Sequence, residues 1–171
     1  MEGMVAYGPV PTMEEAGVDV EEKRFEAQPA IVIRTAARQQ DMGPAMSELF
    51  PAVLAFVLQS AAEPAGPPFC RYLSMGGEEW EFECGMAVTD PVAGEGRVEA
   101  TELPGGDVVT TMHVGPYETL GQSWGALEGW MQENGRVPGG APWEVYWTDP
   151  GEVPDPAEWR TELVMPLGSE G

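Results

Sequence analysis

The chain has 171 residues, of which 43% are hydrophobic and 22% charged, and its formal net charge at pH 7 is -21. This length and composition predict one folded domain with a core large enough to be stable without disulfides or metal ions. The negative charge repels phosphate backbones and anionic lipids, and the basic residues form no cluster. We therefore expect no direct binding to nucleic acid and no binding to membranes.

The residues that commonly bind metals are few. Cys70 and Cys84 have neither a CxxC nor a zinc-ligand spacing, and His113 is the single histidine, so we expect no metal site and no cofactor. The sequence allows a disulfide between the two cysteines but does not require one. The longest apolar run, residues 50–58, is too short to span a bilayer, and residues 1–17 lack the basic start of a signal peptide. We predict a cytoplasmic protein with a flexible segment at residues 1–17.

In chain order, the first half of the sequence predicts a strand, an extended segment, a helix and two strands, over residues 18–26, 30–38, 44–62, 69–74 and 80–88. The second half predicts two strands around a Pro-Gly-Gly turn, a helix and two strands, over residues 97–103, 108–114, 116–134, 143–148 and 160–167. Pro51 should kink the first helix or mark its start. In the second helix, Gly121, Gly125 and Gly129 recur every four residues, which favours close packing against a sheet or another helix.

Three sequence matches in the same order indicate an internal duplication. Gly43-Pro44 corresponds to Gly115-Pro116, the stretch PFCRY to PWEVY, and the Trp-Glu-Met pattern of residues 80–86 to that of residues 159–165. The predicted fold is therefore α+β, with two strand–helix–strand–strand units related by pseudo-twofold symmetry. The units cover about residues 18–92 and 95–168 of a single domain, 18–168. We expect antiparallel sheets with both helices on one side and a ligand cleft on the other.

One strand carries a carboxylate among aromatic residues. Because strand side chains alternate between faces, one set should face the helices as core: Trp143, Val145 and Trp147. The other set should line the cleft: Glu144 and Tyr146, with Cys70 and Tyr72 in the equivalent places of the first half. An acid among aromatic rings suits a flat, apolar, positively charged ligand, because the rings attract cations and the ligand offsets the buried charge. The alternative is an exposed charge on an edge strand.

Several motifs together resemble the GyrI-like small-molecule-binding family, which is related to the effector-binding domains of AraC- and MerR-type regulators. They are HVGPYE at residues 113–118, the helix with Trp124 and Trp130, PWEVYWTDP at 142–150 and TEL at 161–163. The resemblance is strong over residues 108–167 and weaker, though colinear, over 30–88. It implies a duplicated α+β domain around a central pocket. It also implies that Glu144 contacts cationic drugs and that Tyr117 and Tyr146 line the same pocket.

Further candidate ligand contacts are Tyr72, Cys70, Trp124 and His113. For two of them the alternative is the commoner role of the residue type: core packing for Cys70 and a hydrogen-bonded strand histidine for His113. Residues 1–17 are too few for a helix-turn-helix domain, so we expect the stand-alone form of the family.

Three functions follow from these features. The first is binding of hydrophobic aromatic, preferably cationic, small molecules. The second, implied by part of the family, is a hydrolase that opens the cyclopropane ring of DNA-alkylating natural products by adding water. In such an enzyme Glu144 would position or deprotonate the water, and Tyr117 or Tyr146 would donate a hydrogen bond to the developing anion. The third, suggested by one branch of the family, is inhibition of a topoisomerase by protein–protein contact.

Overall fold

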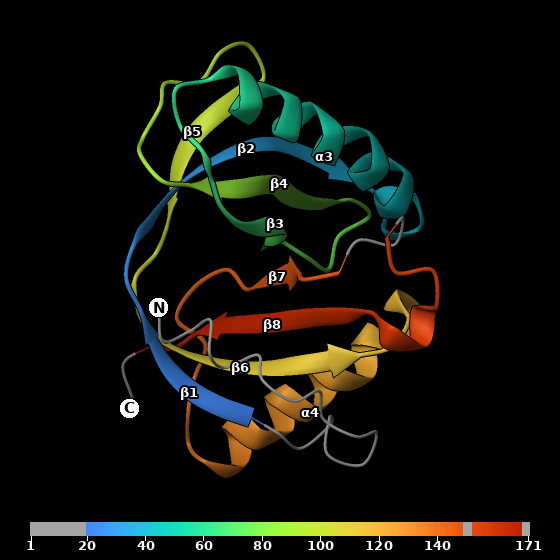
Figure 1. The fold of residues 1–171 in the computed structure, drawn as a ribbon. Coiled ribbons are helices and arrows are strands. Elements are labelled where there is room, and N and C mark those ends of the chain that lie inside the picture. The colour runs from blue at the N-terminus through green and yellow to red at the C-terminus, as the bar shows by residue number, and fades with distance from the viewer. Residues whose placement is uncertain (1–19, 149–151, 169–171) are drawn as a thin grey trace.

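The computed structural model describes residues 20–148 and 152–168. The segment predicted to be flexible, residues 1–17, and Asp149-Pro150 of the family motif lie outside the described residues. The described chain forms one antiparallel sheet of eight strands and two α-helices (Figure 1). The strands are β1 (Val20–Phe25), β2 (Gln28–Ala37), β3 (Pro64–Ser74), β4 (Trp80–Val88), β5 (Val98–Leu103), β6 (Gly106–Val114), β7 (Trp143–Tyr146) and β8 (Arg160–Pro166). The helices are α3 (Met42–Gln59) and α4 (Leu120–Glu133), with short 3-10 turns at Gln39–Asp41, Tyr117–Thr119 and Pro156–Glu158.

The order of the strands across the sheet is β1-β6-β8-β7-β3-β4-β2-β5. This order reads the same from either end when each strand is exchanged for its counterpart in the other half (β1 for β5, β2 for β6, β3 for β7, β4 for β8). At the centre, Cys70 of β3 lies opposite Glu144 of β7. A pseudo-twofold axis therefore passes between these two residues. The predicted α+β fold with duplicated units is confirmed.

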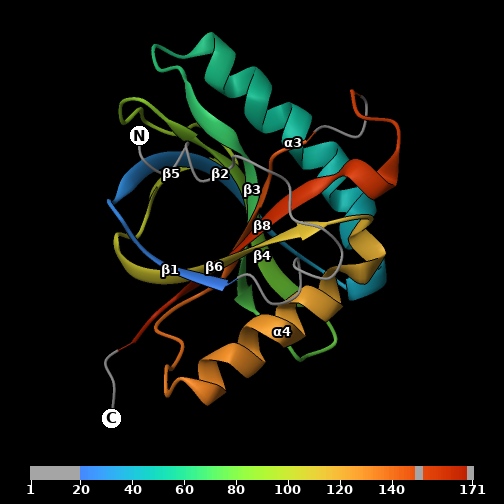
Figure 2. The same cartoon turned by 60° about the horizontal axis from the view of Figure 1, so that its bottom comes forward.

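The Pro-Gly-Gly stretch is a bend in a long ribbon and does not close a hairpin. β5 pairs with β2 and β6 pairs with β1, so residues 98–114 run antiparallel beside residues 20–37. This ribbon connects the two ends of the sheet, which curls into the ring seen at the left of Figure 2. Gly105 lies at the bend, where a Cβ atom would come within 2.7 Å of the backbone nitrogen of Ala27. Only glycine fits this close approach.

Both helices cover the same face of the sheet, as predicted. The strand registers place Cys70, Glu144 and Leu163 side by side on that face. The core around Cys70 includes Leu49, Val53 and Val57 of α3, and the core around Leu163 includes Leu127 and Met131 of α4.

The opposite, helix-free face closes a core of its own inside the curled sheet. Trp143 and Phe69 are buried there, and Val145 packs against them. Phe25 and Leu103 of the ribbon pack against the same cluster. The prediction that Trp143 and Val145 face the helices is therefore wrong. The residues alternate between two faces as inferred, but Trp143 and Val145 lie on the helix-free face and Glu144 on the helix-bearing face. The reason is that the curled sheet forms an apolar interior without help from a helix.

Two further expectations about the helices are corrected. α3 begins at Met42 and continues through Pro51, so Pro51 does not mark its start. The helical stretch Gln39–Gln59 contains an 18-residue segment with a mean hydropathy of 1.3, and by length and composition it is the one stretch in the described part of the chain that could cross a membrane. It is longer than the apolar run noted in the sequence. The row of glycines in α4 makes no close packing contact, because a Cβ atom at Gly121, Gly125 or Gly129 would meet nothing within 4 Å.

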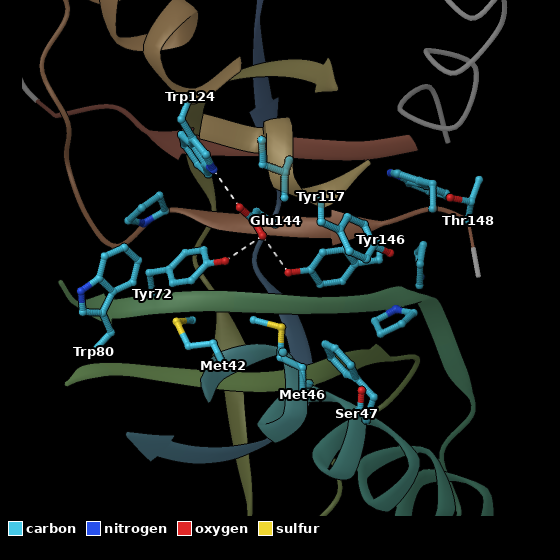
Figure 3. A pocket seen from close by; sticks show the side chains of 18 of the residues that line it. Met42, Met46, Ser47, Tyr72, Trp80, Tyr117, Trp124, Glu144, Tyr146 and Thr148 are labelled. Carbon is cyan, nitrogen blue, oxygen red and sulfur yellow. Dashed lines mark hydrogen bonds between the residues drawn. The ribbon is translucent and has the colours of Figure 1, made fainter. Parts of the chain in front are cut away.

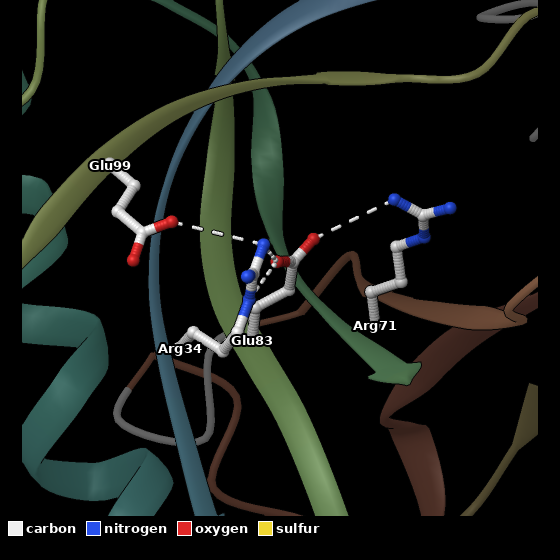
Figure 4. A network of polar contacts seen from close by, with 4 residues as sticks. All are labelled: Arg34, Arg71, Glu83 and Glu99. Carbon is white, nitrogen blue, oxygen red and sulfur yellow. Dashed lines mark hydrogen bonds and ion pairs between the residues drawn. The ribbon is translucent and has the colours of Figure 1, made fainter. Parts of the chain in front are cut away.

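A buried carboxylate anchors the helix-free face. Glu83 is 1% exposed and accepts hydrogen bonds from Arg34, with Nε 3.3 Å and Nη2 3.2 Å from Oε1. Arg71 places Nη1 3.7 Å from the other oxygen of Glu83, and Arg34 also lies 3.8 Å from Glu99 (Figure 4). The equivalent acid of the second half, Glu162, is also buried and receives the indole N–H of Trp147 at 3.1 Å. Each half thus holds one buried acid by pairing it, as burial of a charge requires.

We predict that Arg71→Met lowers the free energy of unfolding by about 2 kcal/mol, because Glu83 loses the less exposed of its two cations while staying buried. Urea denaturation of both proteins measures the difference. The control is Arg24→Met, which removes the exposed ion pair with Asp107 and should change stability by less than about 0.5 kcal/mol. Equal effects of the two substitutions would contradict the role given to Arg71.

Candidate ligand-binding site

A cavity of about 1350 Å³ lies between α3 and α4 on the helix-bearing face of the sheet (Figure 3). Its lining comes from both halves: Met42, Met46 and Phe50 from α3, Tyr72 and Trp80 from β3 and β4, Tyr117 and Trp124 from the start and middle of the second helical segment, and Glu144 and Tyr146 from β7. The prediction of a cleft on the face away from the helices is wrong. The polar side chains of β7 point toward the helices, since α4 contributes a hydrogen-bond donor and the curled face of the sheet is already filled.

Glu144 is the buried acid of this cavity, with 3% of its surface exposed. Tyr72 and Tyr146 each donate their phenol O–H to Oε1 at 2.7 Å, and Trp124 donates its indole N–H to Oε2 at 2.8 Å. A carboxylate offers about four acceptor positions, so three are met by neutral protein donors. No described basic side chain pairs with this charge. The alternative of an exposed edge-strand charge is wrong, because β7 lies in the middle of the sheet.

The pseudo-twofold axis explains why two tyrosines meet one carboxylate. Tyr72 follows Cys70 by two positions, and Tyr146 follows Glu144 by two positions, so both phenols point to the helix-bearing face on either side of the axis. In Figure 3 the two rings approach Glu144 from opposite sides. The duplication thus brings two equivalent donors to a single acid, which one half alone could not do.

All charged residues among the described cavity-lining residues are acidic: Glu118, Glu128, Glu144 and Glu152. Glu118 and Glu128 are exposed, so the solvent screens them far more than Glu144. Within residues 20–148 and 152–168, no group of three or more His, Cys, Asp and Glu side chains could hold a metal ion. The cavity therefore combines aromatic walls with a negative field.

A family model described as the GyrI-like small molecule binding domain matches residues 18–167. The chain belongs to this family. The resemblance inferred from the motifs is thus confirmed, and the protein carries a small-molecule-binding domain. No curated protein sequence matches the chain.

Solved structures share the fold of this GyrI-like domain. The C-terminal domain of EcmrR superposes with a TM-score of 0.78 and 23% identity, over 88% of this chain and 97% of that one. The chain spans only 57% of the longer EcmrR chain solved in a DNA complex, with a TM-score of 0.76 and 24% identity over 88% of this chain. SAV2435, solved bound to tetraphenylphosphonium, gives a TM-score of 0.66 at 11% identity, over 88% and 94% of the two chains. A protein described as a hydrolase from Listeria innocua gives 0.66 at 16% identity, over 98% and 97%.

The structure brings together five of the seven residues singled out in the sequence: Glu144, Tyr146, Tyr117, Tyr72 and Trp124 all line the cavity of the GyrI-like domain. Cys70 does not line it. This residue is fully buried beside Cys84, its partner across β3 and β4, and both thiols are free.

His113 does not line the cavity either. Its ring nitrogens lie 2.7 Å from Ser123 Oγ, 3.0 Å from the Pro116 carbonyl oxygen and 3.1 Å from Thr119 Oγ1. It therefore holds the start of the helical segment that carries Tyr117 and Trp124. The alternative noted above, a hydrogen-bonded strand histidine, describes this environment.

Sequence reasoning missed the contribution of α3 and of Trp80. Met42, Met46 and Phe50 line the cavity although they belong to a helix that was placed on the far side of the sheet from the cleft. The signal that could have found them is the apolar composition of this helix around its circumference, which exceeds what one buried stripe needs.

The phenols around Glu144 stay protonated well into the alkaline range. Burial, and then the negative charge of Glu144, raises the pKa of Tyr72 and the pKa of Tyr146 well above the usual value of 10. Burial, followed by the hydrogen bond with Cys84, likewise raises the pKa of the Cys70 thiol well above its usual value. All three groups keep their protons in the folded protein at pH values where the unfolded chain releases them.

We predict that stability falls at alkaline pH, first above about pH 8.5 from Cys70 and then more steeply above about pH 10 from the two tyrosines. The folded state binds more protons there, so each group lowers the free energy of unfolding by about 1.4 kcal/mol per pH unit, and none of them affects it below pH 8.5. Urea denaturation between pH 7 and 11 measures how steeply the free energy of unfolding falls with pH. Tyr146→Phe removes one of the titrating groups and should make this fall above pH 10 less steep by about 1.4 kcal/mol per pH unit. Phenolate absorbance at 295 nm gives the check: if Tyr72 and Tyr146 ionise near pH 10 while the protein is folded, the prediction is wrong.

Proposed function

We propose that this GyrI-like domain binds hydrophobic, aromatic, preferably cationic small molecules in the cavity between α3 and α4, and so serves in xenobiotic protection or sensing. The observation that carries the proposal is the charge of Glu144, which is buried among aromatic rings with three neutral donors and no described counter-ion. A buried charge is costly unless it is paired, and a bound cation supplies the missing opposite charge.

The lining adds two supports. Aromatic faces attract cations by roughly 0.5 to 2 kcal/mol per contact, and Tyr72, Tyr146 and Trp80 all line the cavity. The three outer glutamates lower the electrostatic potential at its rim, which favours the approach of cations. SAV2435, which shares the fold, was solved with the aromatic cation tetraphenylphosphonium.

The net charge of -21 repels phosphate backbones and anionic lipids, which supports a role without direct contact with nucleic acid or membrane, and action in the cytoplasm is part of the same proposal.

We predict that Glu144→Gln weakens tetraphenylphosphonium binding by about tenfold or more, on the order of 1.4 kcal/mol, and leaves binding of neutral triphenylphosphine oxide within twofold. The amide oxygen still accepts from Tyr72 and Tyr146, so two of the three hydrogen bonds remain and the fold should persist. Only the bond from Trp124 is lost, because an amide NH2 group cannot accept it. Isothermal titration calorimetry gives both affinities, and the melting temperature checks the fold.

The matched control is Glu133→Gln, which removes an exposed charge of α4 outside the cavity lining and should leave both ligands unaffected. A Glu144→Gln protein that binds the phosphonium as the parent does would show that the carboxylate has no part in recognition.

A hydrolase is the second candidate, favoured by one geometric feature. Glu144 Oε1 lies between two phenols whose raised pKa values keep them protonated, so an acceptor and two O–H donors meet at one place in an aromatic cavity. Water addition to a strained ring needs an acceptor for the proton of water and a donor for the oxygen that becomes negative. Binding ranks first, because three of the roughly four acceptor positions of Glu144 are already occupied by hydrogen bonds and only one is left to take a proton from water.

A turnover measurement separates the two functions. If the domain only binds, we expect a cyclopropane-bearing alkylator to be recovered chemically unchanged after incubation with one-tenth its amount of protein. A hydrolase instead converts several equivalents to the ring-opened hydrate, and Glu144→Gln abolishes the conversion. Chromatography with mass detection of the added water decides between these outcomes.

A further inference from the structure

The cavity has two aromatic walls, one from each half of the duplicated chain. On one side the rings of Tyr72 and Trp80 meet edge to face, with centroids 6.1 Å apart. On the other side the ring of Tyr146 meets Tyr117 at 5.8 Å. Tyr72, Trp80, Tyr117 and Tyr146 all line the cavity, and Figure 3 shows the two pairs on opposite sides of Glu144.

The carboxylate lies between these walls because it is next to the pseudo-twofold axis. The axis passes between Cys70 and Glu144, and the two phenols related by it donate to the same oxygen at the same distance, 2.7 Å. The negative charge is thus central, and aromatic surface is available on both sides of it.

The walls are alike in chemistry but not in the residues that build them. The counterpart of Trp80 in the sequence repeat is Trp159, whose ring lies 4.8 Å from Tyr117. Tyr117 thereby takes the place in the second wall that Trp80 has in the first. Both walls end in a ring that can stack on a ligand, and neither carries a basic group.

The volume is larger than one aromatic unit needs. Small-molecule sites usually measure about 300 to 1,000 Å³, whereas this cavity measures about 1350 Å³. A ligand with a single ring at the carboxylate would leave one wall without a partner.

We propose that the site selects cations that carry aromatic groups on both sides of a central charge, with the charge at Glu144, one arm on the Tyr72–Trp80 wall and the other on the Tyr146–Tyr117 wall. This inference rests on the proposed function and adds a rule of shape to it: the position of the charge between two rings decides affinity, and the number of rings does not.

Three quaternary ammonium ions test the rule in the full chain by calorimetry. Dibenzyldimethylammonium has one ring on each side of the charge, benzyltrimethylammonium has one ring only, and (2,2-diphenylethyl)trimethylammonium has two rings on the same side. We expect the dibenzyl compound to bind at least fivefold more tightly than either of the others. Equal affinities of the two compounds that have two rings would overturn the proposal.

Variants of the two walls give an independent result. Trp80→Leu and Tyr117→Leu each remove one ring and keep apolar volume, so each should weaken the dibenzyl compound about fivefold. The single-ring compound should stay within twofold in both, because its ring can use the remaining wall. Trp130→Leu, which removes a ring of α4 outside the cavity lining, is the control and should change none of the affinities. Loss of dibenzyl binding in only one of the two wall variants would contradict two-sided recognition.

A measurement on the unmodified protein covers the case in which a wall variant does not fold. Nuclear Overhauser contacts from the ring protons of the dibenzyl compound should reach both Trp80 and Tyr117, and contacts to one wall alone would overturn the proposal.

The results also distinguish a failure of the shape rule from a failure of the proposed function. If none of the three ions binds, or if Glu144→Gln weakens none of them, cation recognition itself is wrong and the shape rule falls with it. If all three bind with equal strength and Glu144→Gln weakens all of them, the function stands and only the shape rule is lost.

Discussion

The burial of one negative charge is the constraint on which the site depends. Glu144 is nearly inaccessible to water, so its oxygens must find donors in the protein, and they find them on three elements: β3, β7 and α4. Each donor is neutral, which satisfies hydrogen bonding without cancelling the charge. The negative field that remains in the cavity is the feature on which we base the proposed binding of cations.

Duplication supplies the two tyrosines of this environment, and a break in its symmetry leaves a single carboxylate between them. The equivalent of Glu144 in the first half is Cys70, a small, buried, uncharged group. Two acids facing each other across the axis would repel, whereas one acid and one thiol leave a single charge that both tyrosines can reach. The halves are therefore alike in backbone and different at the position to which we assign the counter-charge for a ligand.

The helix-free face has a supporting role. Because the long ribbon curls the sheet, Trp143 and Phe69 form a core without a covering helix, and Glu83 and Glu162 are held there by cations and N–H donors. Both helices are then available to enclose the cavity from the other face. This division explains why α3 is apolar over more than one stripe: some of its residues pack in the core, and others line the cavity.

The sequence by itself determined the α+β class, the duplication, the order of the elements and the grouping of Glu144 with Tyr72 and Tyr146, because strand alternation and repeated motifs are local properties of the chain. Only the tertiary structure decided which face of the sheet the cavity occupies, that α3 and Trp80 line it, and that His113 and Cys70 do not. Those outcomes depend on how the ribbon of residues 20–37 and 98–114 curls the sheet and on where α4 places Trp124. Pairing between segments far apart in the chain has no period that a single sequence reveals.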